Sequence, residues 1–236
     1  MTDLSTSAPR PVATLAPSRR VGGIGGIVFV VAVIAQNVIR SSMPAMDAST
    51  RDVIAFYGSH RGAGFVLAVL FPIGALGLAA FAGGMYPLLG TTETRGPATA
   101  GFVGLTGVVA LFATTHATDM ALASYIHRGT PDPGAVSVLW SLHNAVFAAL
   151  LVVLGVALAG TSAAASGAGL VGRRWKEVGG LGGLALLATG AAGPSLLDGS
   201  PVMALGLIGF VVWLVFLTVA SVGLLREPSA VTAAPG

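Results

Sequence analysis

Long hydrophobic stretches alternate with short polar segments along almost the whole chain. Six of these stretches reach the length of about 20 mainly apolar residues that a transmembrane helix needs. They cover residues 21–39, 62–89, 98–126, 135–160, 178–197 and 201–225. The fifth is poor in large apolar side chains and meets Pro194 near its end, so whether it crosses the membrane fully stays open. The pattern predicts an all-α polytopic membrane bundle of six transmembrane helices.

The composition agrees with this pattern and excludes other classes of protein. Only 9% of the 236 residues are charged and 54% are hydrophobic, whereas about a quarter of an average soluble domain is charged. The same values exclude an intrinsically disordered chain, which has low hydrophobicity and high net charge. No basic stripe is interleaved with aromatic residues, so the expected partner is the lipid bilayer and no nucleic acid. The absence of cysteine excludes disulfides, thiolate catalysis and cysteine-bound metals.

The distribution of basic residues predicts the orientation of the bundle. With six helices both termini lie on one side of the membrane, and that side holds eight cations: Arg10, Arg19, Arg20, Arg95, Arg173, Arg174, Lys176 and Arg226. The opposite side holds four: Arg40, Arg51, Arg61 and Arg128. Because positive residues concentrate on the cytoplasmic side, we expect cytoplasmic termini in the bacterial cytoplasmic membrane. Residues 1–20 and 227–236 are predicted to be disordered tails, and residues 21–226 the transmembrane domain.

One extramembrane segment carries a pattern of its own. Ser49 precedes Asp52 by three residues, which resembles a helix capping box with Asp in place of Glu. Val53, Ile54, Phe56 and Tyr57 then give an apolar side, which predicts a short amphipathic helix over residues 50–60 at the outer membrane interface. An ordered loop packed on the helix ends is the alternative.

Glycine is abundant within the predicted spans, and its spacing indicates close helix packing. The chain has 34 glycines, with Gly22 and Gly26 four residues apart and Gly101, Gly104 and Gly107 three apart. Because the hydrophobic effect does not drive association in lipid, small residues that let backbones approach are the usual contacts between membrane helices. The sequence leaves open whether these faces pack within one chain, in a homo-oligomer or against another membrane protein.

The few polar residues inside the spans are predicted to form one cluster. Asp119 lies twelve residues before Pro131, the centre of the loop between the third and fourth helices, and His143 lies twelve after it. An antiparallel hairpin therefore brings both to one depth, about 10 Å from the outer helix ends. His116 shares the face of Asp119. Since a buried Asp must pair or become protonated, we expect His143 or His116 to be its partner.

Further residues extend this candidate ligand-binding site, and its role stays open. Asn144 faces the same cluster, and Trp140 lies near its outer mouth, where it belongs to an aromatic belt or lines the site; His60 and His127 are expected to be solvated. Three functions remain: a structural polar clamp, as in an accessory subunit; a site that binds or translocates a small molecule; or a membrane-embedded oxidoreductase. The last would use His116, Asp119 and His143 for a metal, or the two histidines for haem b. No cofactor or catalytic residue is otherwise predicted.

Three segments carry a resemblance to a known family. They are Phe56-Tyr57-Gly58-Ser59-His60-Arg61, then Val138-Leu139-Trp140-Ser141-Leu142-His143-Asn144, and a basic segment with Trp175 leading into Gly179-Gly180-Leu181-Gly182. In this order they resemble a family of uncharacterised six-helix integral membrane proteins of actinobacteria and other bacteria. The resemblance implies a six-helix fold and a membrane location, and it implies no activity.

Overall fold

The computed structural model describes residues 15–88 and 92–226. In these ranges the chain is helical and contains no strand. The long helices are α1 (Leu15–Arg40), α3 (Arg61–Met85), α4 (Thr92–His127), α5 (Pro133–Gly167) and α8 (Met203–Leu225). Shorter elements are α2 (Thr50–Ser59), the 3-10 turn η2 (Tyr86–Leu88), α6 (Trp175–Ala191) and α7 (Gly193–Leu197). The all-helical class is as predicted.

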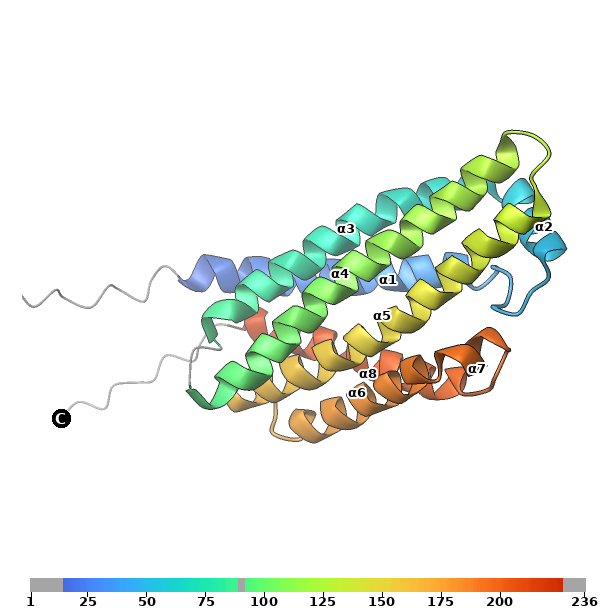
Figure 1. Cartoon of the computed structure of the whole chain (residues 1–236). Coiled ribbons are helices and arrows are strands. Elements are labelled where there is room, and N and C mark those ends of the chain that lie inside the picture. Colours follow the sequence, from blue (N-terminus) through green and yellow to red (C-terminus); the bar gives the residue numbers. More distant parts are fainter. Residues whose placement is uncertain (1–14, 89–91, 227–236) are drawn as a thin grey trace, which may run out of the picture.

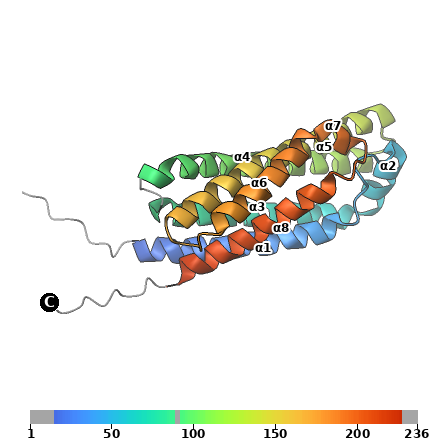
Figure 2. The ribbon, with the colours of Figure 1, turned by 90° about the horizontal axis from the view of Figure 1, so that it is seen from below.

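The long helices and α6 form a closed ring around a shared core. Around this ring α1 packs on α3, α3 on α4, α4 on α5, α5 on α6, α6 on α8, and α8 back on α1. Figure 1 shows α4 and α5 as a long hairpin, and Figure 2 shows α8 beside α1. The least extensive contact in the ring is the one between α3 and α4. The ring therefore has a seam there.

Within the described ranges, five helices are long and apolar enough to cross a membrane: α1, α3, α4, α5 and α8. The fifth predicted span is divided into α6, of 17 residues, and the five-residue α7 that contains Pro194. Large apolar side chains cover the outward faces of the long helices, for example Val31, Leu76, Val103 and Val138. A protein whose outer surface is apolar is suited to a lipid environment.

The helices extend further than the hydrophobic stretches. Helix α4, which contains the third hydrophobic stretch, begins at Thr92 instead of residue 98. The helical backbone continues through the polar residues before that stretch and includes Pro97. Similarly, α1 begins at Leu15, inside the range predicted as a tail. The rest of that tail, residues 1–14, and the C-terminal tail 227–236 lie outside the described residues.

The two ends of the bundle differ. At one end, the terminal end, α1 begins and α8 finishes, with Gly23 against Leu225. The other end, the α2 end, carries α2, the α4–α5 connection and α7 (Figure 1). A helix occupies residues 50–59, and the Ser49 hydroxyl accepts a hydrogen bond from the Asp52 backbone N–H at 3.3 Å. The position of α2 at the outer membrane interface stays a prediction.

Glycine faces bring neighbouring helices of this chain into close contact. A Cβ on Gly22 would lie 2.6 Å from the Cα of Gly84, so α1 and α3 touch backbone to backbone. Gly101 meets Thr161 in the same way between α4 and α5. The pairs Gly101–Thr161 and Asp119–His143 are both centred on residue 131, which is the predicted turn of the hairpin. Glycine packing thus sets the register that brings the polar residues together.

Candidate functional site

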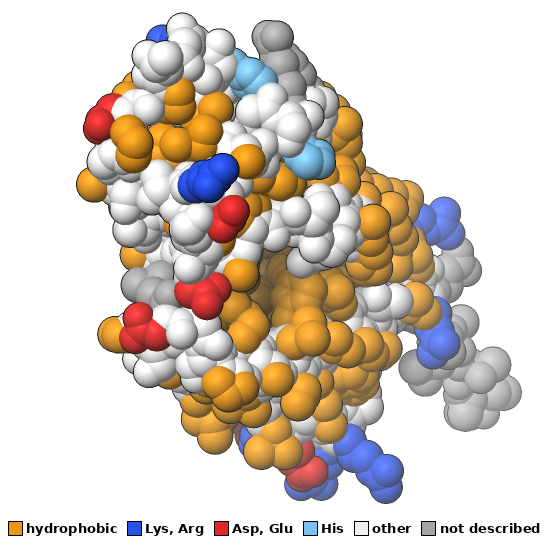
Figure 3. Space-filling model, turned by 90° about the vertical axis from the view of Figure 1, so that its right-hand side faces the viewer, with side chains coloured by type: hydrophobic (Ala, Val, Ile, Leu, Met, Phe, Trp, Pro, Cys, Tyr) orange, Lys and Arg blue, Asp and Glu red, His pale blue; other side chains and the backbone are white. Residues whose placement is uncertain are grey.

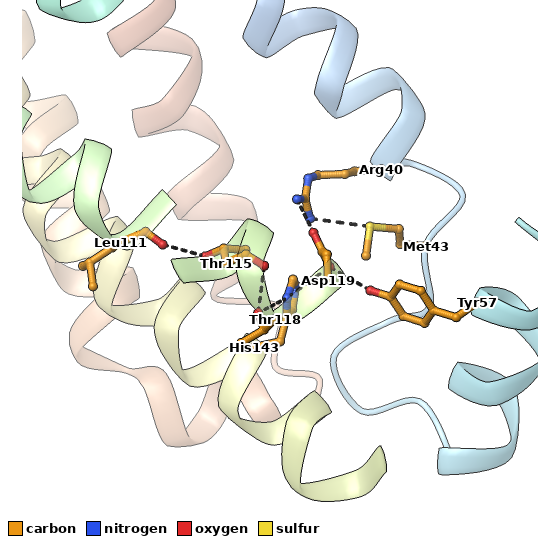
Figure 4. Close-up of polar contacts among 8 residues, drawn as sticks. All are labelled: Arg40, Met43, Tyr57, Leu111, Thr115, Thr118, Asp119 and His143. Atoms are coloured by element: carbon orange, nitrogen blue, oxygen red, sulfur yellow. Dashed lines mark hydrogen bonds and ion pairs between the residues drawn. The ribbon is translucent and has the colours of Figure 1, made fainter. Parts of the chain in front are cut away.

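Asp119, on α4, is the centre of a buried polar cluster near the α2 end (Figure 4). The residue is only 5% exposed. Its Oδ2 lies 2.5 Å from Nη2 of Arg40, and its Oδ1 accepts a hydrogen bond from the Tyr57 hydroxyl at 2.7 Å. His143 Nδ1 lies 3.2 Å from the same Oδ1. Side chains from three other helices, α1, α2 and α5, therefore converge on this carboxylate of α4, and we call the cluster the Asp119 centre.

Arg40 reaches the centre from the last turn of α1. A cation is favoured there because the C-terminal end of a helix carries partial negative charge. The guanidinium also donates from Nη1 to the Met43 sulfur at 3.6 Å. The sequence interpretation assigned Arg40 to the aqueous side as an orientation signal. The structure instead turns its side chain inward, since a buried carboxylate needs an opposite charge.

Tyr57 reaches the centre from α2. Val53 and Tyr57 form the buried side of this helix and pack on Leu122 of α4 and Val136 of α5. Burial and the neighbouring Asp119 carboxylate raise the pKa of the Tyr57 phenol above its ordinary value. The phenol therefore stays protonated, as its role as hydrogen-bond donor to Asp119 requires.

His143 is held on both its polar and its apolar side. Its Nδ1 is 3.2 Å from the Thr118 hydroxyl as well as from Asp119. Because the Thr118 hydroxyl donates to the carbonyl of Thr115 at 2.7 Å, the network assigns a proton to His143 Nδ1. The imidazole also stacks on Trp140, with ring centroids 5.1 Å apart and planes 6° apart.

The other predicted site residues divide into two groups. The polar groups of Trp140 and Asn144 are directed to the backbone: Trp140 Nε1 and Asn144 Nδ2 both donate to the Met46 carbonyl, at 3.2 and 3.0 Å. They anchor the segment between α1 and α2. His116 packs against the rings of Phe71 and Phe112, each centroid 4.9 Å away, and these two rings also contact each other at 5.7 Å. Its Nε2 is buried and has no hydrogen-bond partner among the described residues.

A cavity of about 450 Å³ opens beside the Asp119 centre, where α2 faces the seam between α3 and α4. We call it the α2 cavity. Its lining is Ile39, Met43, Phe56, Tyr57, His60, Ala63, Gly64, Leu67, Ala68, His116, Asp119, Met120, Ala123, Ser124, His127 and Arg128. His60 and His127, expected to be simple surface residues, thus belong to its wall. Figure 3 looks onto the α2 end and shows histidine side chains at the surface and, apart from them, a recess with hydrophobic walls.

The geometry does not favour the metal alternative. Across residues 15–88 and 92–226, no group of three or more His, Cys, Asp or Glu side chains is arranged to hold a metal ion. His116, Asp119 and His143 do not form such a set, and both oxygens of Asp119 already have partners in Arg40 and Tyr57. The haem alternative stays a prediction.

Sequence reasoning missed two members of the centre, Arg40 and Tyr57. A signal for Arg40 was present, because it is the cation that directly ends the first hydrophobic stretch. Tyr57 was recognised as part of an apolar helix side, and only the docking of α2 on α4 and α5 turns its hydroxyl toward Asp119. No protein-family model, curated protein or solved structure matches this chain. Its function must therefore be inferred from the geometry of the site.

Proposed function

We propose that this chain is a six-span protein of the bacterial cytoplasmic membrane that binds a small molecule in the α2 cavity. The observation that carries the proposal is the position of His116 in the wall of a 450 Å³ cavity, beside Asp119, with its Nε2 buried and unpaired. Buried polar groups normally have hydrogen-bond partners. A ligand with a hydrogen-bonding group can supply this one, while the charge of the neighbouring Asp119 is balanced by Arg40.

The lining indicates the chemistry of the ligand. Ile39, Leu67 and Met120 give the cavity apolar walls, whereas the imidazoles of His60 and His127 lie at exposed positions on its wall. Ligand pockets typically combine apolar walls with a few polar groups that fix orientation, in volumes of roughly 300–1,000 Å³. We infer an amphiphilic small molecule whose apolar part faces α3 and whose polar group approaches His116.

The proposed orientation and the proposed sixth span are supported by the length of α6 and by the positions of the basic residues. The 17 residues of α6 extend about 25 Å, close to the thickness of the hydrocarbon core. Leu181 and Leu184 are 71% and 61% exposed, as expected for side chains that face lipid. With α6 and α7 as a span, Arg173, Arg174 and Lys176 lie at the terminal end. That end is therefore the cytoplasmic one, and the α2 cavity opens toward the outside.

The packing favours binding over passage through the protein. Backbone contacts at Gly22–Gly84 and Gly101–Thr161 join α1 to α3 and α4 to α5 in the terminal half. Such close contacts leave little room for a path between the α2 cavity and the cytoplasmic side.

Retention of small molecules by the purified protein tests this proposal. Wild-type protein is incubated with a bacterial metabolite extract, washed, and its retained compounds are identified by mass spectrometry. The cavity-filling variant is Ala68→Trp, because Ala68 lines the α2 cavity. The matched control is Val69→Trp, since Val69 is the next residue on α3, is 60% exposed and does not line the cavity.

We expect a compound that wild-type and Val69→Trp protein retain and Ala68→Trp protein loses. Retention that is equal in all three proteins, or the absence of any enriched compound, would contradict a ligand site. The Asp119 centre would then be a structural clamp between α1, α2, α4 and α5.

A further inference from the structure

A second cavity lies inside the helix ring, on the other side of the Arg40–Asp119 pair from the α2 cavity. We call it the bundle cavity; its volume is about 270 Å³. It is lined from α1, α4, α5 and α8 by Phe29, Val33, Gln36, Asn37, Arg40, Val108, Phe112, Thr115, Phe147, Leu150, Leu151, Leu154, Met203, Ala204, Gly206, Leu207, Phe210 and Trp213. Arg40 is the one charged residue in this lining, so the bundle cavity is a largely apolar space.

Two fully buried polar groups in its wall have no partner among the described residues. Gln36 is 0% exposed, and neither its Nε2 nor its Oε1 makes a hydrogen bond. Trp213 is also buried, and its indole Nε1 makes none. The neighbouring amide of Asn37 differs, because it donates to the Val33 carbonyl at 2.8 Å. Leaving a buried amide unpaired is unfavourable, and a hydrophobic residue at position 36 would avoid the penalty.

The unpaired atoms in the wall of the bundle cavity indicate the chemistry of a ligand that would bind there. Gln36 Nε2, Trp213 Nε1 and the buried Nε of Arg40 are donors, and Gln36 Oε1 is the only unpaired acceptor among these side chains. The charge of Arg40 is balanced by Asp119. A matching ligand is therefore neutral, apolar over most of its surface and equipped with an oxygen that accepts hydrogen bonds.

The position of the bundle cavity indicates how a ligand would reach it. Leu207 on α8 lines the cavity and is also 60% exposed, and Ala204 one turn earlier is exposed as well. The cavity thus borders the lipid-facing surface of α8. Molecules dissolved in the bilayer have direct access at this border.

We propose that the bundle cavity is a binding site for a neutral, membrane-soluble molecule that carries a carbonyl oxygen, with Gln36 as its hydrogen-bond donor. A volume of 270 Å³ holds a single ring system or a short segment of chain. The same chemistry occurs in a free quinone-like compound and in the ester carbonyl of a lipid acyl chain. This site is separate from the α2 cavity and does not depend on the function proposed for it.

Binding of 2-methyl-1,4-naphthoquinone to the purified protein tests the proposal, since quinones quench tryptophan emission. We expect saturable quenching in wild-type protein and about tenfold weaker binding in Gln36→Leu. Gln36→Leu should unfold at the same or a higher temperature, because it removes an unpaired buried amide, so weaker binding would not reflect misfolding. The control Thr106→Leu removes a polar side chain that already has a partner, since its hydroxyl donates to the Phe102 carbonyl, and Thr106 lies outside the bundle cavity. It should change binding less than threefold.

A steric pair of variants gives an independent measurement. Ala204→Phe fills the border of the bundle cavity and should abolish saturable quenching, whereas Ile208→Phe, at a lipid-facing position of α8 outside the cavity, should retain it. Mass spectrometry of organic extracts of the purified proteins then distinguishes the two sources of the ligand. The compound that wild-type protein retains and Gln36→Leu protein loses is expected to be either a phospholipid or a free neutral carbonyl compound. Quenching that is unsaturable, or equal in wild type, Gln36→Leu and Ala204→Phe, would overturn the proposal. Ala68→Trp should leave this binding unchanged, which separates it from the α2 cavity.

Discussion

The guanidinium of Arg40 and the carboxylate of Asp119 form an ion pair with 2.5 Å between Nη2 and Oδ2. The two residues come from α1 and α4, which are not neighbours in the helix ring. Arg40 lines the bundle cavity and Asp119 lines the α2 cavity, so the pair lies between the two. A change in either residue therefore alters the wall of one cavity and removes the ion-pair partner of a residue in the wall of the other.

Asp119→Asn should strongly destabilise the protein. The substitution leaves the Arg40 charge without its partner in a mostly buried position, and breaking a buried pair from one side typically costs about 3–5 kcal/mol. Thermal unfolding in detergent measures the effect. The double variant Arg40→Met with Asp119→Asn should regain most of the loss, because it removes both charges and keeps a carbonyl oxygen that can accept the Tyr57 hydrogen bond. Equal unfolding temperatures for Asp119→Asn and the double variant would contradict the importance of the unpaired charge.

The stability of the fold should fall at high pH through Tyr57. Burial and Asp119 raise the pKa of its phenol in the folded protein above the value of 10.0 of an unperturbed tyrosine. The stabilisation that this shift provides is complete below pH 10, and it is progressively lost as the pH rises above that value, where the unfolded chain ionises first. Unfolding temperatures measured from pH 8 to 11 should therefore decline more steeply above pH 10 in wild type than in Tyr57→Phe. Parallel curves for the two proteins would count against a buried, protonated Tyr57.

Adding a methyl group to Gly183 should destabilise the bundle, whereas adding one to Gly180 on the same helix should not. A Cβ on Gly183 would lie 2.7 Å from the carbonyl oxygen of Gly155, while a Cβ on Gly180 would meet nothing within 4 Å. Overpacking typically costs about 1–3 kcal/mol, and replacing an unconstrained helical glycine with alanine gains roughly 0.5–1 kcal/mol. Thermal unfolding of Gly183→Ala and Gly180→Ala should therefore shift in opposite directions. A shift in the same direction would show that α5 and α6 do not pack as described.

Cysteine labelling should reveal the orientation, and the absence of native cysteine makes single variants unambiguous. Thr130→Cys, in the α4–α5 connection, should react with a membrane-impermeant maleimide in intact cells. Ala168→Cys, after α5, should react only after permeabilisation, because we place it in the cytoplasm. Asp198→Cys, after α7, tests the sixth span: labelling in intact cells means that α6 and α7 cross the membrane together. Protection of Asp198→Cys alongside labelled Thr130→Cys would instead limit the bundle to five spans.

The hydrophobic pattern was sufficient to predict the helical class and the positions of most helices. It could not predict their ends, since α4 begins six residues before its apolar stretch, and it did not predict the division of the fifth stretch into α6 and α7. Counting along the hairpin predicted that Asp119 and His143 lie at one depth, because an antiparallel pair of helices around one turn has few possible registers. It left His143 and His116 as alternative partners, and the structure places His143 beside the carboxylate. The number of spans and the cytoplasmic position of the termini stay predictions.

The sequence by itself determined that this chain is helical and apolar, and that its buried carboxylate would need a partner. Only the tertiary structure decided which partners it has. Arg40 and Tyr57 are 79 and 62 residues away along the chain, and nothing in local spacing reports contacts that arise when a ring of helices closes. For the same physical reason the two cavities, and the unpaired Gln36 in one of them, became visible only after the helices had been placed around a common core.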